Sequence, residues 1–206
     1  MGDAAGLRAS CLSPIPDSIL LEIATDDAER GSVPGEAIGW VSREAKIQQE
    51  KAATMPTIFS TPAEMKTAVG RHLGYSDWLE ITQERINKFG EATGDQHWVH
   101  VDPERARNGP FGGCIAHGFL TLSLIGMFLP QILEVHGIRT GVNYGADRLR
   151  FLEPVKVGAR IRCGGELIRM RDVKDGVEIM VRLTIELEGS ARPACIVDKL
   201  SRYYPE

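Results

Sequence analysis

Residues 119–135 have the sequence FLTLSLIGMFLPQILEV, and this stretch decides the fold that we predict. Coiled into a helix, it is apolar on nearly every side. A helix without a polar face must be enclosed by other elements. We therefore expect a long buried helix from Ile115 to roughly Val135.

The sequence that follows can enclose such a helix. Residues 177–188, VEIMVRLTIELE, alternate between apolar and polar side chains, the pattern of a strand with one buried face. Further strands are expected around 148–151, over 159–170 and over 194–203, with turn residues between them. The sequence thus predicts an α+β fold in which an antiparallel sheet, made mostly of residues 141–204, wraps around a long central helix.

Two shorter helices are indicated before the central one. Thr82 is expected to cap a helix over Gln83–Thr93, with Ile81 and Ile86 at the positions of a hydrophobic staple and Gly94 as the stop. A second short helix is expected from Asp102-Pro103 through Arg107. The segment between the two helices, residues 95–101, is predicted to be a tight loop.

The composition excludes several classes of protein. The chain has 206 residues with 28 acidic and 24 basic side chains and no Lys/Arg-rich run, so nucleic acid is not an expected partner. The longest apolar stretch, Phe119–Leu133, is shorter than the roughly 20 residues that a membrane span needs, so no membrane is expected either. Four widely spaced cysteines and the lack of a secretory signal predict a cytoplasmic protein.

Residues 1–55 differ in composition from the rest. They combine prolines and glycines with charges and offer few apolar side chains to a core. We predict an N-terminal extension that is poorly ordered and dispensable for folding, followed by one domain over residues 56–206.

Candidate catalytic groups lie on both sides of the short helix that starts at Asp102. Asp95 and His100 are five positions apart in the predicted loop, where a carboxylate and an imidazole can share a water molecule or a substrate proton. Gly118 precedes the apolar helix, where unpaired backbone N–H groups can stabilise an oxyanion and a glycine permits close approach. The bland alternatives are that Asp95 caps a turn, that His100 is structural and that Gly118 only starts the helix. No metal site is expected, because His-x-x-His in a loop is unspecific.

Two segments carry a resemblance to a known family. Residues 92–103, ATGDQHWVHVDP, and residues 113–120, GCIAHGFL, resemble the motifs of the MaoC-like dehydratases, which are hot dog proteins related to (R)-specific enoyl-CoA hydratases. Together with GVNYG at 141–145 they are most similar to the branch of nodulation protein N. The resemblance covers roughly Thr57–Tyr204.

The resemblance implies a hydro-lyase, an enoyl-CoA hydratase or 3-hydroxyacyl-CoA dehydratase of fatty acid metabolism. Asp95 and His100 would then activate a water for addition to an enoyl thioester, and the N–H of Gly118 would bind the thioester carbonyl. His97 and His117 would orient the pair. Neither a metal nor an organic cofactor would be needed, because coenzyme A is part of the substrate, or acyl carrier protein replaces it. The candidates for a basic rim that binds its phosphates are four arginines: Arg105, Arg107, Arg148 and Arg150.

One departure from the family pattern leaves two alternatives open. The best-known hydratases carry Asn-Pro where this chain has His97-Trp98. A hot dog thioesterase would aim a carboxylate at the thioester carbon instead. A non-catalytic acyl-binding module would result if His97-Trp98 filled the pocket. In each case we expect a homodimer, because half of a wrapped sheet leaves an edge strand to be paired.

Overall fold

We describe the fold from a computed structural model, which covers residues 55–206. These residues belong to one compact unit that spans Arg43–Glu206. Except for Met55, the predicted N-terminal extension lies outside the described residues, so its order and its role in folding stay predictions.

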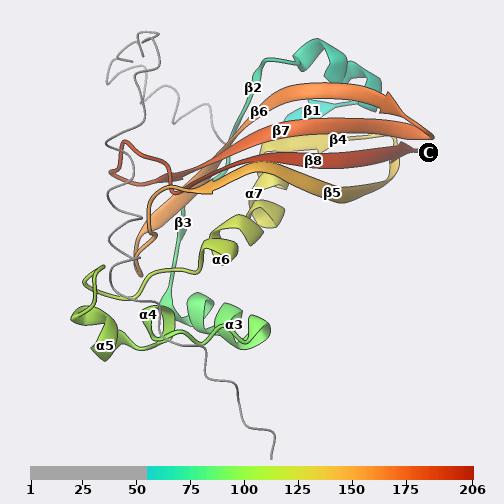
Figure 1. Cartoon of the computed structure of the whole chain (residues 1–206). Coiled ribbons are helices and arrows are strands. Elements are labelled where there is room, and N and C mark those ends of the chain that lie inside the picture. The colour runs from blue at the N-terminus through green and yellow to red at the C-terminus, as the bar shows by residue number, and fades with distance from the viewer. Residues whose placement is uncertain (1–54) are drawn as a thin grey trace, which may run out of the picture. The chain divides into compact units, whose positions relative to one another are not determined.

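A long antiparallel sheet dominates the described part of the chain, as predicted (Figure 1). Its strands are hydrogen-bonded in the order β2-β6-β7-β8-β5, and β3 pairs with β6 beside β2. The sheet therefore consists of the meander that the alternating sequence predicts, with β5 at one edge. The strand bounds are β2 His72–Tyr75, β3 Leu79–Glu80, β5 Ile138–Phe151, β6 Arg160–Val173, β7 Gly176–Leu187 and β8 Cys195–Pro205.

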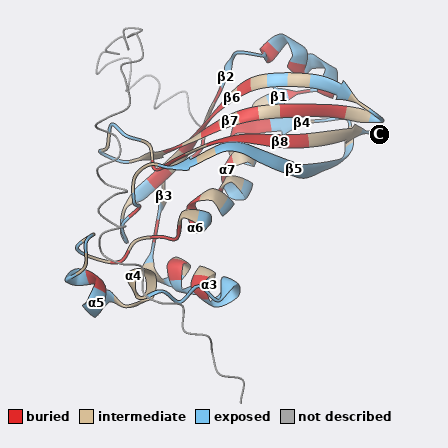
Figure 2. Cartoon of the chain, in the orientation of Figure 1, coloured by how far each residue is buried: buried red, intermediate tan, exposed pale blue. Residues whose placement is uncertain are grey.

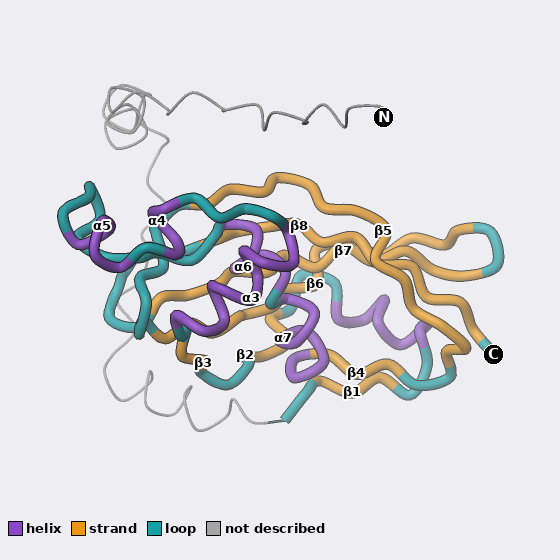
Figure 3. Tube along the Cα trace, turned by 90° about the horizontal axis from the view of Figure 1, so that it is seen from below, coloured by secondary structure: helices purple, strands orange, loops and turns teal. Residues whose placement is uncertain are grey.

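One face of this sheet forms the core with the helices that cross it. The apolar residues of β7, from Val177 to Ile185, are buried in alternation, and Ile161, Cys163 and Leu167 of β6 join them. The helices α6 (Gly118–Ser123) and α7 (Ile125–Ile132) lie across this face (Figure 3). Burying an apolar face of both layers in one core is what stabilises such a two-layer domain.

The central helix is shorter, and less enclosed, than the sequence predicts. It begins at Gly118 rather than Ile115, is divided at Leu124 and ends at Ile132. Leu120, Leu124, Phe128 and Ile132 form a buried stripe, whereas Phe119 is 63% and Met127 39% exposed. The expectation of one continuous helix buried on all sides is wrong for the single chain, because the sheet covers one side only.

Long-range backbone contacts explain both ends of the helix. The N–H groups of Ile115 and Ala116 donate to the carbonyls of Val99 and Val155, so this segment is held in an extended loop. At the other end, Leu133–Val135 forms β4 and pairs in parallel with β1 (Thr57–Phe59). Pro130 lies inside α7 and lacks the N–H that would continue the hydrogen-bond ladder.

The local helix signals are confirmed. The hydroxyl of Thr82 accepts a hydrogen bond from the Arg85 N–H at the start of α3 (Gln83–Thr93), and Gly94 ends this helix with φ 78°. Asp102 caps α5 (Pro103–Arg107) through the Arg105 N–H. The predicted tight loop between them contains one more turn of helix, α4 (Trp98–Val101). Near the start of the described chain, Pro62–Ala68 forms the 3-10 helix η1.

The other face of the sheet carries a ladder of ion pairs. The carboxylate of Glu178 on β7 accepts hydrogen bonds from Arg171 of β6 and Arg202 of β8. Arg182 of β7 donates two hydrogen bonds, of 2.8 and 2.9 Å, to Asp198 of β8. Glu178 and Asp198 are only 1% and 2% exposed although they point away from the apolar core. Charged neighbours on adjacent strands therefore cover these two carboxylates.

Three further features of the described residues concern membrane spans, cysteines and the edge of the sheet. Within residues 55–206, no helix is both long and apolar enough to cross a membrane. The three cysteines of this range, Cys114, Cys163 and Cys195, are buried and free. The edge strand β5 is exposed over most of its length, in contrast to its neighbours (Figure 2).

Candidate active site

The turn after α3 carries Asp95. Gly94 adopts the left-handed conformation, φ 78°, which reverses the chain at the end of the helix. The carboxylate of Asp95 has one protein donor, the backbone N–H of His97, at a long 3.4 Å from Oδ1. Its side chain is 54% exposed. Asp95 therefore makes a weak turn contact, as the bland alternative expects, but keeps most of its acceptor capacity free.

His100 is held in one orientation from two sides. Its Nδ1 lies 2.8 Å from the carbonyl oxygen of Ile115, so Nδ1 carries the proton and donates it. Its own carbonyl accepts a hydrogen bond of 2.7 Å from Nε2 of Gln83. Burial lowers the pKa of His100 below 6.5, and the hydrogen bond to Ile115 offsets part of that shift. The ring is thus a neutral imidazole at pH 7 with Nε2 available as a base.

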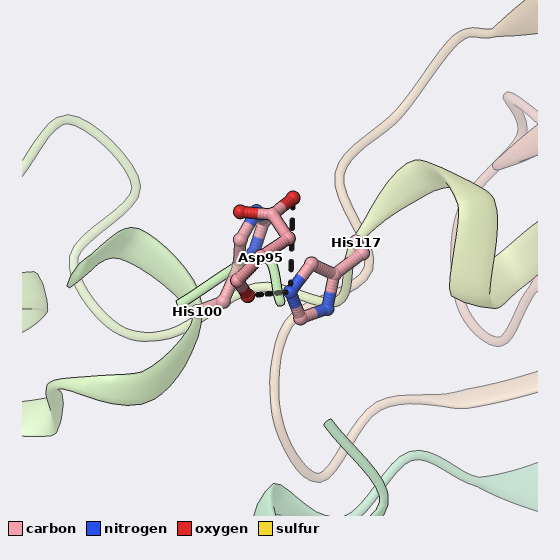
Figure 4. Close-up of side chains that lie close together, drawn as sticks. All are labelled: Asp95, His100 and His117. Atoms are coloured by element: carbon pink, nitrogen blue, oxygen red, sulfur yellow. Dashed lines mark hydrogen bonds and ion pairs between the residues drawn. The ribbon is translucent and has the colours of Figure 1, made fainter. Parts of the chain in front are cut away.

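His117, immediately before α6, joins the same cluster (Figure 4). Its ring is buried and stacks on the ring of His100, with 3.8 Å between the centroids. Nε2 donates to the backbone carbonyl of Asp95 at 2.9 Å, and the carboxylate of Asp95 is 4.0 Å away. Nδ1 is buried and has no hydrogen-bond partner among residues 55–206. His117 therefore links the loop of Asp95 to the start of the central helix.

The polar atoms of the three side chains lie close together. One carboxylate oxygen of Asp95 and one ring nitrogen from each of His100 and His117 all lie within 4.8 Å of one another. A water that hydrogen-bonds to two such atoms sits about 2.8 Å from each, so two atoms at this separation can share one water. The sequence-predicted pair Asp95 and His100 is therefore brought together in the geometry that a shared water requires.

Gly118 is the first residue of α6 and directly follows His117 in the chain. The N–H groups of the first turn have no partner inside a helix. A Cβ at Gly118 would lie 3.0 Å from the ring of Phe151 on β5, so a larger residue would displace that ring. The absence of a side chain keeps the start of the helix accessible while Phe151 packs against it.

The rings of His97 and Trp98 lie beside the cluster and contact each other. The ring centroid of His97 is 6.3 Å from that of His100 and 5.5 Å from that of Trp98. The indole of Trp98 packs against Gly109, and the guanidinium of Arg105 covers it at 4.5 Å. Trp98 is thus engaged with α5 and the loop after it.

The four arginines of the predicted basic rim are all exposed, but they are scattered over two elements. Arg105 and Arg107 lie on α5, and Arg148 and Arg150 lie on β5. Arg105 is stacked on Trp98, and Arg148 is 4.0 Å from the carboxylate of Asp198. Their role in binding phosphates stays a prediction.

Sequence reasoning missed the residues that support the pair from α3. A Cβ at Gly90 would lie 2.8 Å from the carbonyl oxygen of Asp95, so the loop can pack here only against a glycine. Phe89 contacts the ring of His117, with 5.0 Å between the centroids. Gln83 holds the backbone of His100. No local pattern marks these positions, because each matters through a contact with a distant part of the chain.

The same cluster is the one group in the described part of the chain with the composition of a metal site. Two of its four imidazole nitrogens already donate to backbone carbonyls, at Ile115 and Asp95. The groups left are Nε2 of His100, the enclosed Nδ1 of His117 and the Asp95 carboxylate. A proton-transfer site uses the same three groups, so their presence does not by itself indicate a metal.

Comparisons with known proteins identify the family of this chain. The family model described as "MaoC like domain" matches residues 64–188. The 3-hydroxyacyl-thioester dehydratase Z of Mycobacterium tuberculosis is 47% identical over 146 residues, which are 70% of this chain and 97% of that protein. Nodulation protein N of Rhizobium leguminosarum bv. viciae is 41% identical over 64% of this chain and 84% of its own length.

Solved structures support the hot dog fold. The R-hydratase PhaJ1 from Pseudomonas aeruginosa matches with a TM-score of 0.54 and 24% identity, over 67% of this chain and 83% of that chain. The (R)-hydratase of A. caviae matches with the same TM-score of 0.54 and 23% identity, over 66% and 96% of the two chains. The predicted fold class is therefore confirmed.

Proposed function

This chain belongs to the family of MaoC-like domains, and on that premise we propose that it is a hydro-lyase acting on acyl thioesters. It adds water to a trans-2-enoyl thioester, or removes water from a 3-hydroxyacyl thioester. The observation that carries the proposal is the Asp95–His100 pair: a carboxylate oxygen and a ring nitrogen lie within 4.8 Å of each other, and the Ile115 carbonyl selects one histidine tautomer. A relative named as a dehydratase, at 47% identity, supports the same reaction.

In the proposed mechanism one water lies between the two side chains. The Asp95 carboxylate accepts one of its protons in a hydrogen bond, and Nε2 of His100 takes the other as the oxygen bonds to the β-carbon. The C=C π electrons move toward the thioester carbonyl, which gives an enolate. The imidazolium of His100 then returns its proton to the α-carbon. Atoms and charge balance, and dehydration is the same path in reverse.

The backbone N–H of Gly118 is proposed to stabilise the enolate. A donor held at the end of a helix costs no reorganisation when charge develops on the carbonyl oxygen. His117 supports both partners, because it lies between the Asp95 loop and Gly118 in the chain and contacts Asp95 directly. We assign His117 and His97 to orientation rather than to proton transfer.

We propose that the reaction needs no metal and no organic cofactor, because the base, the acid and the oxyanion donor are all supplied by the chain. The thioester carrier, coenzyme A or acyl carrier protein, comes with the substrate. Extensive dialysis against EDTA should leave hydration unchanged. A loss of activity that Zn²⁺ or Mg²⁺ restores would show that the Asp95 cluster is a metal centre instead.

A homodimer and a cytoplasmic location complete the proposal. β5 has a hydrogen-bonded neighbour, β8, on one side only, and Val142, Tyr144 and Phe151 are 42%, 54% and 43% exposed along it. A long uncovered edge strand invites pairing with a second copy. Sedimentation should give a dimer at micromolar concentration, and a monomer would contradict this part. Free cysteines are consistent with a reducing compartment.

The experiment that tests the function is a paired assay on crotonyl-CoA. Loss of enoyl absorbance reports hydration, and a thiol reagent reports release of free coenzyme A. We expect loss of absorbance without thiol release. Thiol release would identify a thioesterase, and binding without either signal would identify an acyl-binding module.

A further inference from the structure

A cavity of about 350 Å³ lies between α7, β5 and β8, apart from the cluster around Asp95. This volume is in the range of small-molecule sites. One side is apolar and comes from α7 and the residues after it, whereas β8 contributes three side chains with polar atoms. The apolar side comprises Ile125, Leu129, Pro130, Leu133 and Val135, and the polar side comprises Lys199, Ser201 and Tyr203.

Lys199 is the unusual member of this lining. It is 5% exposed, on the face of β8 that points to α7. Its ammonium donates to the hydroxyl of Ser201, which is the partner that residues 55–206 supply. The one carboxylate that lines the cavity, Glu134, is 2.6 Å from the ring of His136 and is bound there. An ammonium has three protons to donate, so two are left for a ligand.

A buried cation with one neutral partner is costly unless an anion joins it. Burial lowers the pKa of Lys199 to about 8, so most molecules still carry the charge at neutral pH. A methionine would fill the same space at lower cost. The lysine therefore makes chemical sense as the partner of an anion that enters the cavity, and an apolar wall opposite suits a ligand whose anionic group ends a hydrocarbon chain.

β5 contacts the start of α6 near the candidate active site and also lines the cavity with α7. At one end Phe151 of β5 packs against Gly118 at the start of α6. At the other end, residues 141–143 of β5 face α7 across the cavity. Gly118 and Gly126 are eight positions apart, about 12 Å at the helical rise. An acyl chain whose thioester lies at Gly118 would thus reach the cavity by following the helices along β5.

We propose that this cavity holds the far end of the acyl chain and that Lys199 selects chains that end in a carboxylate. This inference rests on the proposed function and names its substrate class: thioesters of dicarboxylic 2-enoic acids. Ser201 holds the ammonium toward the cavity, and the apolar residues of α7 contact the methylene groups that precede the carboxylate.

The test compares matched substrates on the wild-type protein. The pairs are trans-2-hexenoyl-, octenoyl- and decenoyl-CoA against the corresponding trans-2-enedioyl-CoA. At one chain length we expect kcat/KM to be about tenfold or more higher for the carboxylate-ended member. If no enoyl-CoA is hydrated, the proposed function fails. If the methyl-ended thioesters are hydrated and are preferred at every length, the inference alone is overturned.

Lys199→Met should remove the preference by lowering kcat/KM for the carboxylate-ended thioester about tenfold and leaving that for the methyl-ended one unchanged or higher. Lys174→Met is the matched control, because Lys174 lies exposed in the turn between β6 and β7 and its loss should change neither value. Lys199→Gln provides a second variant if the methionine variant does not fold. An unchanged ratio in a folded Lys199 variant would overturn the inference.

Binding of free acids shows whether the cavity holds the end of the substrate's acyl chain or a separate effector molecule. Suberate and octanoate should inhibit crotonyl-CoA hydration weakly, because they lack the thioester contacts at Gly118. If these acids bind tightly and raise the Tm of the wild type but not of Lys199→Met, while no enedioyl-CoA is preferred, the cavity is an effector site and the assignment to the substrate is wrong.

Discussion

The two polar regions of this domain differ in how completely their groups are paired. On the outer face of the sheet, Glu178 lies between two arginines and Asp198 is held by two nitrogens of one guanidinium group. In the loop after α3, the described residues give the Asp95 carboxylate one long hydrogen bond and the buried Nδ1 of His117 none. Both regions contain carboxylates and cationic or basic partners, so composition does not separate them.

This difference indicates which of the two regions can take part in proton transfer. A carboxylate whose oxygens are saturated by arginines has no capacity left for a ligand or a proton, and it contributes to stability. A carboxylate and an imidazole that lie close together and keep unpaired acceptor atoms can exchange protons with a shared water. Loss of a paired group should therefore lower stability, and loss of an unpaired group should lower activity. The predictions below test that separation.

The largest effect is expected for the unpaired region. Asp95→Asn should lower kcat for crotonyl-CoA hydration about 10²- to 10⁴-fold, the usual contribution of general acid–base catalysis, because Asp95 holds the water from which His100 takes the proton. Combining it with His100→Ala should lower kcat little further, because groups that act as a unit are not additive. Stopped-flow absorbance and a thermal melt of each variant provide the two readouts. Additive losses would contradict a shared water.

Gly90→Ala should affect activity through position alone. The added Cβ meets the carbonyl oxygen of Asp95 at 2.8 Å, so the loop must move. We expect kcat to fall about 10- to 100-fold, since small displacements of reacting groups are costly. Alanine also favours the helix, by up to about 1 kcal/mol, which limits the loss of stability. Glu91→Ala, an exposed neighbour on α3, is the control and should retain full activity.

Glu178→Ala should show the opposite pattern. It leaves Arg171 and Arg202 without their common partner, and we expect the free energy of unfolding to fall by about 2 kcal/mol with kcat unchanged. Glu188→Ala removes an exposed pair with Arg160 and should cost less than about 1 kcal/mol. Urea unfolding measures both. A loss of kcat in folded Glu178→Ala would mean that the two regions are coupled.

The smallest effect concerns pH. Burial lowers the pKa of His100, so the ring stays neutral and basic as the pH falls through 6.5. The acid limb of kcat/KM for hydration should therefore have its midpoint below 6.5, and activity at pH 6.5 should exceed half of its maximum. An acid limb centred above 6.5 would indicate that the protein stabilises the imidazolium in the free enzyme.

Local sequence signals predicted the helices around the site. The features that depend on long-range contacts were not predicted. Thr82, Ile81, Ile86 and Gly94 define α3 because capping and stapling involve neighbours in the chain. The first ten residues of β5 carry no alternation, since both faces of this edge strand are exposed. The start of the central helix depends on hydrogen bonds from Ile115 and Ala116 to Val99 and Val155, which no local pattern reveals.

The site residues also divide into those that local patterns predict and those that depend on distant contacts. Asp95, His100 and Gly118 were identified from spacing and family resemblance, and the structure brings the first two within reach of one water. The contribution of Gly90 and Gln83 was not predicted, because each acts through a contact with the 95–100 loop that α3 alone does not show.

The central claim, that Asp95 and His100 act on one shared water, is tested most directly by comparing two histidine variants. His100 is hydrogen-bonded to the Ile115 carbonyl and lies close to Asp95, whereas the ring of His97 packs at a tilt against Trp98. The kcat for crotonyl-CoA hydration should fall by at least about 10²-fold in His100→Ala and only severalfold in His97→Ala. Retained hydration in His100→Ala together with its loss in His97→Ala would contradict the account.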